Sequence, residues 1–284
     1  MFTLSGLFWH NAFFVGYYSA MNKIFITGAS SGIGQALAHE CASRYAGTGL
    51  ALGLVARRQS ELQKLASELQ TQHKITCAIY SLDVRDSKAM QTAAQDFIAR
   101  FGAPNIVIAN AGVSRGTLTQ EKEDIAAFQA VFDINVMGMV HTFNPFISAM
   151  REAKQGQLVG VASVAGIRGL PGAGAYSASK AAAISYLESL RVEMQAFGIH
   201  VTTVAPGYIR TPMTDVNKYK MPFLMDVDVF AEKFMNAVEA KRRFIFIPWQ
   251  MGVLARFMRF VPPALWDFAM KNAPHKERTR WDWL

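Results

Sequence analysis

The chain has 284 residues, of which 51% are hydrophobic and 18% charged, so it is long and apolar enough for one large globular domain with a buried core. Its two cysteines, Cys41 and Cys77, exclude a disulfide framework and favour reduced thiols inside the cell. It has no His-x-x-x-His or Cys-x-x-Cys pair, so we predict no metal site, and the net charge of +8 comes without any nucleic-acid-binding motif.

Residues 1–20 are apolar and aromatic and contain no Lys or Arg. They lack the positive region that precedes the apolar run of a secretory signal, and polar residues interrupt them too often for a spanning helix. Three interpretations remain open. The segment is an over-extended start with Met21 as the true first residue, an ordered arm packed on the domain or a partner, or an interfacial anchor.

From residue 23 onward, short β-branched or apolar runs alternate with stretches typical of helices. This alternation predicts βαβ units and a doubly wound parallel sheet of the Rossmann type, with three α/β/α layers. We place strands at 24–27, 50–56, 76–81, 106–109, 158–162, 200–205 and 244–247, and helices at 60–70, 87–100 and 125–150 among others. Residues 21–248 are therefore predicted to form one domain whose ligand lies outside the carboxyl ends of the strands.

A glycine-rich turn follows the first predicted strand and opens the first helix. It reads Gly28-x-x-x-Gly32-x-Gly34, with Ser30, Ser31 and Ile33 between the glycines. Glycines permit a tight turn and let the backbone approach a pyrophosphate, whose charge is attracted by the amides at the helix N-terminus. In this context the pattern predicts a dinucleotide site, the alternative being a purely structural turn.

The end of the second strand indicates which dinucleotide is preferred. An acid there usually holds the ribose 2′-hydroxyl, whereas an arginine accommodates a 2′-phosphate. Here Arg57 and Arg58 follow the strand, and the first acid is Glu61. We predict NADP(H) in preference to NAD(H), with Arg57 as the first choice for the phosphate and Arg58 as the second. The alternative is a solvated pair of surface arginines.

A Ser–Tyr–Lys set stands further along the chain. Ser163 follows the fifth strand, and Tyr176 and Lys180 are four residues apart in a predicted helix, so they lie on one face. A tyrosine ordinarily keeps its proton until pH ~10, and a nearby ammonium group lowers that pKa. We predict that Lys180 tunes Tyr176 to exchange a proton near neutral pH, as reduction of a carbonyl requires.

Other motifs occur in the same order. They are Asn110-Ala111-Gly112 after the fourth strand, Asn135 in the next helix, and Pro206-Gly207 after the sixth strand. Together with the glycine turn and the Ser–Tyr–Lys set, they resemble the short-chain dehydrogenase/reductase family, in its shorter branch, over about residues 23–248. One departure is Ala109, where a second Asn often precedes the Asn-Ala-Gly triplet.

The resemblance implies four catalytic residues. Ser163 would hydrogen-bond the substrate oxygen, Tyr176 would donate its proton, and Lys180 would also bind the nicotinamide ribose. Asn135 would hold a water beside the lysine and complete a proton relay, unless it is only a core asparagine.

The resemblance also implies the walls of the cofactor site. Asp83 and Val84 would border the adenine, although Asp83 could instead cap the helix at 87–100. The remaining wall residues are Asn110, Ala111 and Gly112 on the ribose side, then Pro206 and Gly207, and then Ile209 and Thr211 at the nicotinamide carboxamide. Asn110 could serve mainly to brace neighbouring backbone.

The substrate side is read from two segments. Residues 208–240 should form a lid, and its methionine-rich, apolar composition suits a lipophilic ligand, unless these residues pack on the core or on a partner subunit. Arg168, in the loop after Ser163, could bind an acidic group.

We expect an NADPH-dependent reductase that converts a lipophilic ketone or aldehyde to an alcohol with Tyr176 as general acid. The alternatives are an NAD(P)-dependent secondary-alcohol or sterol dehydrogenase working oxidatively, and a low-turnover dinucleotide-binding scaffold.

Residues 249–284 form a basic amphipathic tail with two short predicted helices, at 251–260 and 264–271. Residues 241–284 contain nine Lys and Arg against three acids, a net charge of +6. Such a tail suits an anionic membrane surface, a subunit interface or a cover over the substrate pocket. We expect a cytoplasmic homo-oligomer, with peripheral contact at the inner face of a membrane as one alternative.

Overall fold

A computed structural model of the chain describes residues 21–217, 219–276 and 278. The three interpretations of residues 1–20 therefore concern a segment outside the described residues.

One parallel sheet of seven strands runs through the molecule, as predicted. The strands are β1 (Asn22–Thr27), β2 (Leu50–Ala56), β3 (Thr76–Ser81), β4 (Ile106–Ala109), β5 (Gly156–Val161), β6 (Ile199–Pro206) and β7 (Phe244–Ile247). Their order is β3-β2-β1-β4-β5-β6-β7, and every neighbouring pair is parallel. The doubly wound Rossmann fold is thus confirmed, and the strand order reverses between β1 and β4.

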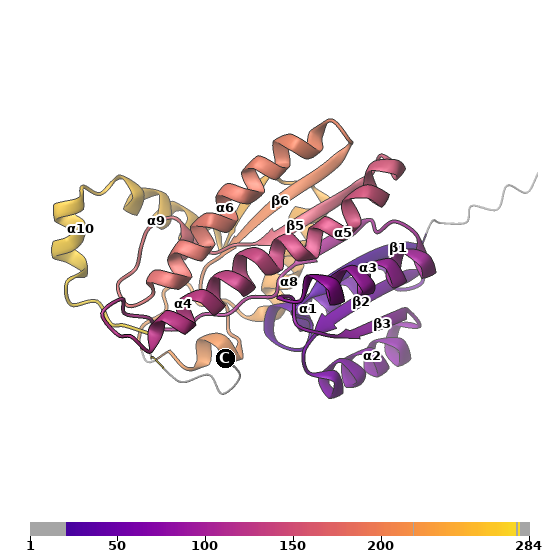
Figure 1. Cartoon of the computed structure of the whole chain (residues 1–284), viewed down its shortest axis with the longest axis horizontal. Helices are drawn as coiled ribbons and strands as arrows, with labels where there is room; N and C mark the ends of the chain where they lie inside the picture. Colours follow the sequence, from indigo (N-terminus) through magenta and orange to yellow (C-terminus); the bar gives the residue numbers. More distant parts are fainter. Residues whose placement is uncertain (1–20, 218, 277, 279–284) are drawn as a thin grey trace, which may run out of the picture.

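Helices cover both faces of this sheet (Figure 1). One core cluster joins the sheet to α1 (Gly32–Arg44), α2 (Gln59–His73) and α8 (Val227–Glu239). The second joins it to α3 (Ser87–Phe101), α5 (Gly138–Ala153) and α6 (Gly174–Gln195). Successive residues of β1 alternate between the clusters, because side chains along a strand point to opposite faces.

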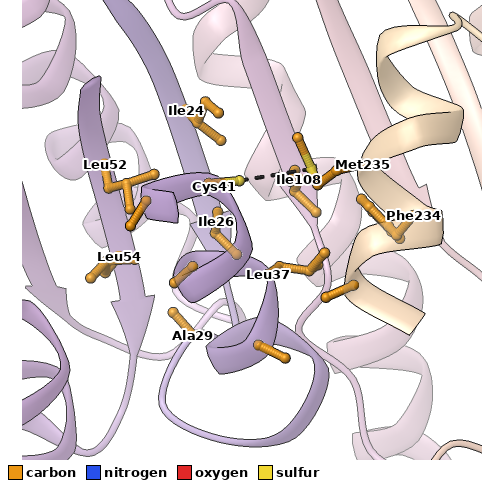
Figure 2. Packing of buried hydrophobic residues seen from close by; sticks show 14 of the residues in the cluster. Ile24, Ile26, Ala29, Leu37, Cys41, Leu52, Leu54, Ile108, Phe234 and Met235 are labelled. Atoms are coloured by element: carbon orange, nitrogen blue, oxygen red, sulfur yellow. Dashed lines mark hydrogen bonds between the residues drawn. The ribbon is translucent and has the colours of Figure 1, made fainter. Parts of the chain in front are cut away.

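The first cluster is closed by contacts between helices that are far apart in sequence. Figure 2 shows Cys41 of α1 beside Met235 of α8, above Ile26 of β1. The Cys41 thiol is fully buried and lies 3.7 Å from the Met235 sulfur. Burial raises the pKa of this thiol well above its usual range, so Cys41 acts as an apolar core residue.

The helix predicted at 125–150 is longer and contains an irregular turn. It consists of α4 (Asp124–Phe132), the π-helical turn η1 (Asp133–Met137) and α5. Among the described residues it is the one helix long and apolar enough to cross a membrane by length and composition, but 44% of its apolar window is buried and α5 packs on β4 and β5. This packing is that of a core helix.

Two helices follow β7, as predicted: α9 (Trp249–Phe260) and α10 (Pro263–Met270). The apolar side chains of α9 lie on two faces: Val253 and Phe257 are exposed, whereas Met251, Gly252 and Ala255 are buried. A Cβ atom on Gly252 would lie 2.6 Å from the Phe246 side chain, so small residues let α9 approach β7 closely.

Candidate functional site

A cavity of about 440 Å³ lies at the carboxyl ends of the strands, where the strand order reverses. Its walls come from the segments after β1, β2, β3, β4, β5 and β6. All the residues predicted to bind cofactor or to act in catalysis line it, except Gly34 and Asn135. The structure therefore brings together residues that are up to about 180 positions apart in the chain.

The glycine turn forms one wall. Gly28 has a φ of +71°, and a Cβ atom there would lie 2.9 Å from the Ala111 Cα. Gly34 lies behind the wall, where a Cβ atom would come 2.1 Å from the Gly28 carbonyl oxygen. Helix α1 can therefore begin close to β1. Ser31 precedes the helix without making a side-chain capping bond, so the first N–H groups of the helix are able to donate hydrogen bonds to an anion.

A hydrogen-bond network fixes the turn against the segment after β4. The Asn110 amide donates to the carbonyls of Thr27 at 3.0 Å and Gly28 at 3.3 Å. The Thr27 hydroxyl accepts the backbone N–H of Asn110 at 3.2 Å and of Ala111 at 3.3 Å. Asn110 thus braces backbone as well as lining the cavity. Thr27 is a site residue that the sequence analysis missed, although it directly precedes the glycine turn.

The two arginines after β2 lie at the part of the cavity beside the glycine turn. Arg58 donates to the Ser30 carbonyl at 3.2 Å and to its hydroxyl at 3.0 Å. Arg57 lies 4.0 Å from the Asp83 carboxylate and its side chain is 46% exposed. The arginines are therefore held at the rim of the cavity rather than free in solvent.

Asp83 is part of a charge cluster and does not cap α3. Burial acts to raise its pKa, but the hydrogen bonds and charge of Arg85, together with the charge of Arg57, hold that pKa below its ordinary value. The cap is Asp86, whose carboxylate accepts the backbone N–H of Lys88 and of Ala89, both at 3.0 Å. The capping alternative for Asp83 is wrong.

Ser163, Tyr176 and Lys180 meet at the opposite end of the cavity. The Ser163 hydroxyl caps the short helix η2 (Val164–Gly166) by accepting the N–H of Ala165 at 3.2 Å. The Lys180 ammonium donates to the Val161 carbonyl at 2.8 Å and lies 5.9 Å from the centre of the Tyr176 ring. Helix α6 thus presents both side chains to the end of β5.

The electrostatics of this group differ from our expectation. Burial raises the pKa of Tyr176, and the hydrogen bond with Ser163 only partly offsets that rise. Burial also lowers the pKa of Lys180 to about 8. In this structure the Lys180 ammonium donates to the Val161 carbonyl, and burial of the ring outweighs the groups that favour the phenolate, so the pKa of Tyr176 lies above its ordinary value.

Asn135 does not line the cavity and lies in the π-helical turn. Its amide donates to the Val113 carbonyl and to the Ser179 hydroxyl, both at 3.0 Å, and its oxygen accepts the Val113 N–H at 2.8 Å. A Cβ atom on Gly112 would lie 3.2 Å from the Asn135 oxygen and 3.4 Å from the Lys180 nitrogen. The absence of a side chain at Gly112 therefore leaves room for both the Asn135 amide and the Lys180 ammonium.

The substrate side differs most from the sequence analysis. Within the predicted lid at 208–240, Met213 in α7 (Pro212–Asp215) lines the cavity, whereas Met225 packs on the core and Phe223 is exposed. Arg168 does not line the cavity. It donates to the carbonyls of Met258 and Val261 and lies 4.4 Å from the centre of the Trp266 ring, so it anchors α9 and α10.

Comparison with known proteins assigns this site to a family. Residues 22–221 match the short chain dehydrogenase family. The chain belongs to this family. It is 36% identical, over 87% of its length and 95% of the relative, to an uncharacterized oxidoreductase of Myxococcus xanthus. It is 31% identical, over 93% of its length and 85% of the relative, to dehydrogenase/reductase SDR family member 7B of Xenopus laevis.

A solved relative shows the same fold. An alcohol dehydrogenase from Thermococcus sibiricus, complexed with 5-hydroxy-NADP, superposes with a TM-score of 0.71 at 25% identity, over 80% of this chain and 95% of that one. This short-chain dehydrogenase is therefore an NAD(P)-binding oxidoreductase that acts on CH–OH or C=O groups. The glycine wall, the uncapped start of α1 and the cavity that they border fit a dinucleotide.

Proposed function

We propose that the protein is an NADPH-dependent reductase that converts a ketone or aldehyde to an alcohol. The observation that carries this proposal is that Ser163, Tyr176 and Lys180 line the same cavity as the glycine turn and Arg57. When bound, NADPH supplies the hydride. The protein has to bind the carbonyl compound, orient it and supply the proton.

Tyr176 is the proton donor in this proposal. Because burial raises its pKa, the hydroxyl stays protonated at neutral pH and can donate to the carbonyl oxygen as negative charge develops there. The Ser163 hydroxyl hydrogen-bonds the same oxygen and fixes its position. The Lys180 ammonium stabilises the phenolate left after proton transfer and would bind the nicotinamide ribose.

Asn135 acts as a positioning residue. Its side chain fixes the backbone of Val113, which lines the cavity, and it lies beside Gly112, as the Lys180 ammonium does. The water relay suggested by the family likeness would pass along this side of the lysine.

The preference for NADPH rests on Arg57 and Arg58. Both line the cavity at the end where the 2′-phosphate would lie, and the guanidinium of each presents a fork of donors. Arg58 is already oriented by Ser30 of the glycine turn, and Arg57 by Asp83. A 2′-phosphate would compete with Asp83 for Arg57 and add a charge-assisted hydrogen bond.

The substrate is proposed to be largely apolar. Val113, Ile209, Pro212 and Met213 line the cavity on the lid side, and a methionine adapts to ligands of irregular shape. The oxidative alternative, a secondary-alcohol or sterol dehydrogenase, uses the same residues with proton and hydride moving in the reverse direction. The scaffold alternative requires that the protein bind a dinucleotide without turning over a carbonyl or alcohol substrate.

The decisive experiment titrates NADPH and NADH separately and then measures NADPH oxidation with a panel of lipophilic ketones and aldehydes. We expect Arg57→Ala to weaken NADPH binding about tenfold to a hundredfold, the effect of losing one charge-assisted bond, and to leave NADH binding unchanged. Arg100→Ala, in an ion pair on α3, is the matched control. Equal or tighter NADH binding would contradict the assignment, and NADPH binding without turnover would favour the scaffold.

The tail helices present a surface suited to peripheral contact with an anionic membrane. Their exposed apolar side chains include Phe257 at 69%, Phe260 at 84% and Phe268 at 70%. Residues 241–271 contain six Lys and Arg and a single acid, Asp267. In an anionic membrane, the apolar side chains of such a surface can enter the acyl-chain region while the cationic side chains contact the negative headgroups. We place the protein in the cytoplasm, as a homo-oligomer able to bind the inner face of a membrane.

Sedimentation with vesicles tests the membrane proposal. The protein should bind vesicles rich in phosphatidylglycerol and not vesicles of phosphatidylcholine alone. The double substitution Phe257→Ser with Phe260→Ser should abolish binding. Ile125→Ser with Val192→Ser, which removes exposed apolar residues from α4 and α6, should not abolish binding. A tail variant that changes the oligomeric state but not vesicle binding would show that the surface is a subunit interface.

A further inference from the structure

The chain after α10 returns to the substrate end of the site. Figure 1 shows this segment running from α10 back towards the loop that precedes α4. His275 packs against Gly172, where a Cβ atom would lie 2.6 Å from the imidazole ring. Gly172 belongs to the loop between η2 and α6, so the segment around His275 packs on the loop that leads into Tyr176.

An ion-pair cluster fixes this returning segment. Arg278 donates to the Asp124 carboxylate at 2.7 Å and lies 3.4 Å from that of Glu121. Asp124 is fully buried at the start of α4 and also lies 3.6 Å from the Arg115 guanidinium. Because Asp124 is buried, release of Arg278 would leave its carboxylate less fully compensated, so this contact favours the docked position of the segment.

Lys276 lies between two segments that border the cavity. Its ammonium donates to the Ser114 hydroxyl at 3.0 Å and to the Met213 carbonyl at 3.4 Å. Met213 lines the cavity, and so does Val113, the residue before Ser114. The last described part of the chain therefore brings a cation to the gap between the segment after β4 and the lid.

The ammonium of Lys276 is not neutralised within the described part of the chain. Its hydrogen-bond partners there are a hydroxyl and a backbone carbonyl, both uncharged, and no described carboxylate forms an ion pair with it. Burial lowers the pKa of Lys276 to about 8, without an acid to counter the shift. A mostly buried cation is normally paired, so a site beside it favours an anion.

We propose that Lys276 is a substrate-binding residue that selects carbonyl compounds carrying an anionic group, such as a carboxylate, at the end remote from the reacting carbonyl. This deepens the proposed reductase function and depends on it. Lys276 takes the role that the sequence analysis gave to Arg168, which instead holds the helices preceding the segment of Lys276. The substrate is then an apolar molecule with one carbonyl and one acidic end.

Turnover of matched substrates tests the proposal. The probes are 4-formylbenzoate and 8-oxooctanoate, each compared with its uncharged methyl ester, with NADPH oxidation as the readout. For at least one pair, the wild-type kcat/KM should be about tenfold to a hundredfold higher for the acid, the range expected of one hydrogen bond to a charged group. Lys276→Gln should remove this preference by raising KM for the acid and leave the ester unchanged. Lys276→Arg should largely restore the preference.

Two further measurements distinguish a failure of the Lys276 proposal from a failure of the proposed reductase function. Lys271→Gln, a control that removes an exposed cation from the same tail, should leave the preference intact. Calorimetry of the NADPH complex with benzoate and benzamide, and with octanoate and octanamide, measures the preference without turnover. Equal wild-type binding of acids and amides, or an equal loss for acid and ester in Lys276→Gln, would overturn the proposal. If the protein is not a reductase, calorimetry would still show tighter binding of the acids than of the amides, but no aldehyde would cause NADPH oxidation.

Discussion

The two ends of the cavity are built in different ways. The cofactor end is made of backbone in close contact, with glycines after β1 packed against the segment after β4 and held by Thr27 and Asn110. The substrate end is made of long side chains and a tail that returns from α10. The first end has a fixed shape suited to a common cofactor. The second can change its specificity through a few side chains without disturbing the sheet.

Substitution of Tyr176 should separate chemistry from cofactor binding most sharply. Tyr176→Phe removes the proposed proton donor and keeps the buried ring. We expect kcat for carbonyl reduction to fall about 10²–10⁴-fold, the usual contribution of general acid catalysis, while the Kd for NADPH stays nearly constant. Stopped-flow turnover and fluorescence titration would measure the two quantities.

The matched control is Tyr186→Phe, on the same helix and partly buried against the second core cluster. It should leave kcat unchanged. If Tyr176→Phe retained most of its activity, another group would have to supply the proton, and the mechanism proposed here would be wrong.

Gly34→Ala tests the close backbone packing of the cofactor end. The added Cβ would lie 2.1 Å from the Gly28 carbonyl oxygen, so α1 must move away from β1 and distort the turn. We expect the free energy of unfolding to fall by about 1–3 kcal/mol, as for overpacked cores, together with a weakened affinity for NADPH. Urea unfolding and NADPH titration measure the two effects.

Gly169→Ala is the control for that substitution, because a Cβ atom there would meet no atom within 4 Å. It lies on the substrate side and should change neither the unfolding midpoint nor NADPH affinity. If Gly34→Ala bound NADPH with normal affinity, the cofactor end would tolerate backbone movement and would not depend on a fixed shape.

The same contrast explains which features the sequence could reveal. The strands, the glycine turn and the Asn-Ala-Gly triplet are local patterns, and the fold brings them together as predicted. The role of Arg168 was wrong because its partners, Met258, Val261 and Trp266, lie about 90 positions further along the chain. No local pattern distinguishes Lys276 from the other basic residues of the tail, and its position depends on where the chain folds back.

The balance between burial and charge was also beyond sequence reasoning. The four-residue spacing of Tyr176 and Lys180 correctly placed them on one helical face, but the ammonium is held by Val161, a residue of a neighbouring strand. Burial then determines the direction of the Tyr176 pKa shift. Spacing along a helix predicts proximity, whereas the sign of a pKa shift depends on the surroundings that the rest of the fold supplies.

Arg168→Ala should produce the smallest effect and the one most confined to the substrate end. It removes two hydrogen bonds to the ends of α9 and the contact with the Trp266 ring, so α10 and the segment after it should detach more often. We expect amide hydrogen exchange in α10 to become faster by an amount equivalent to about 1–3 kcal/mol. KM for carbonyl substrates should rise a few-fold, because Lys276 follows α10, while NADPH affinity should not change.

Arg151→Ala removes a similar cation–ring contact, with Phe197, at a distant site and should leave all three measurements unaltered. A loss of NADPH affinity in Arg168→Ala would mean that the tail supports the cofactor end as well, and the two ends would then have to be treated as one cooperative unit.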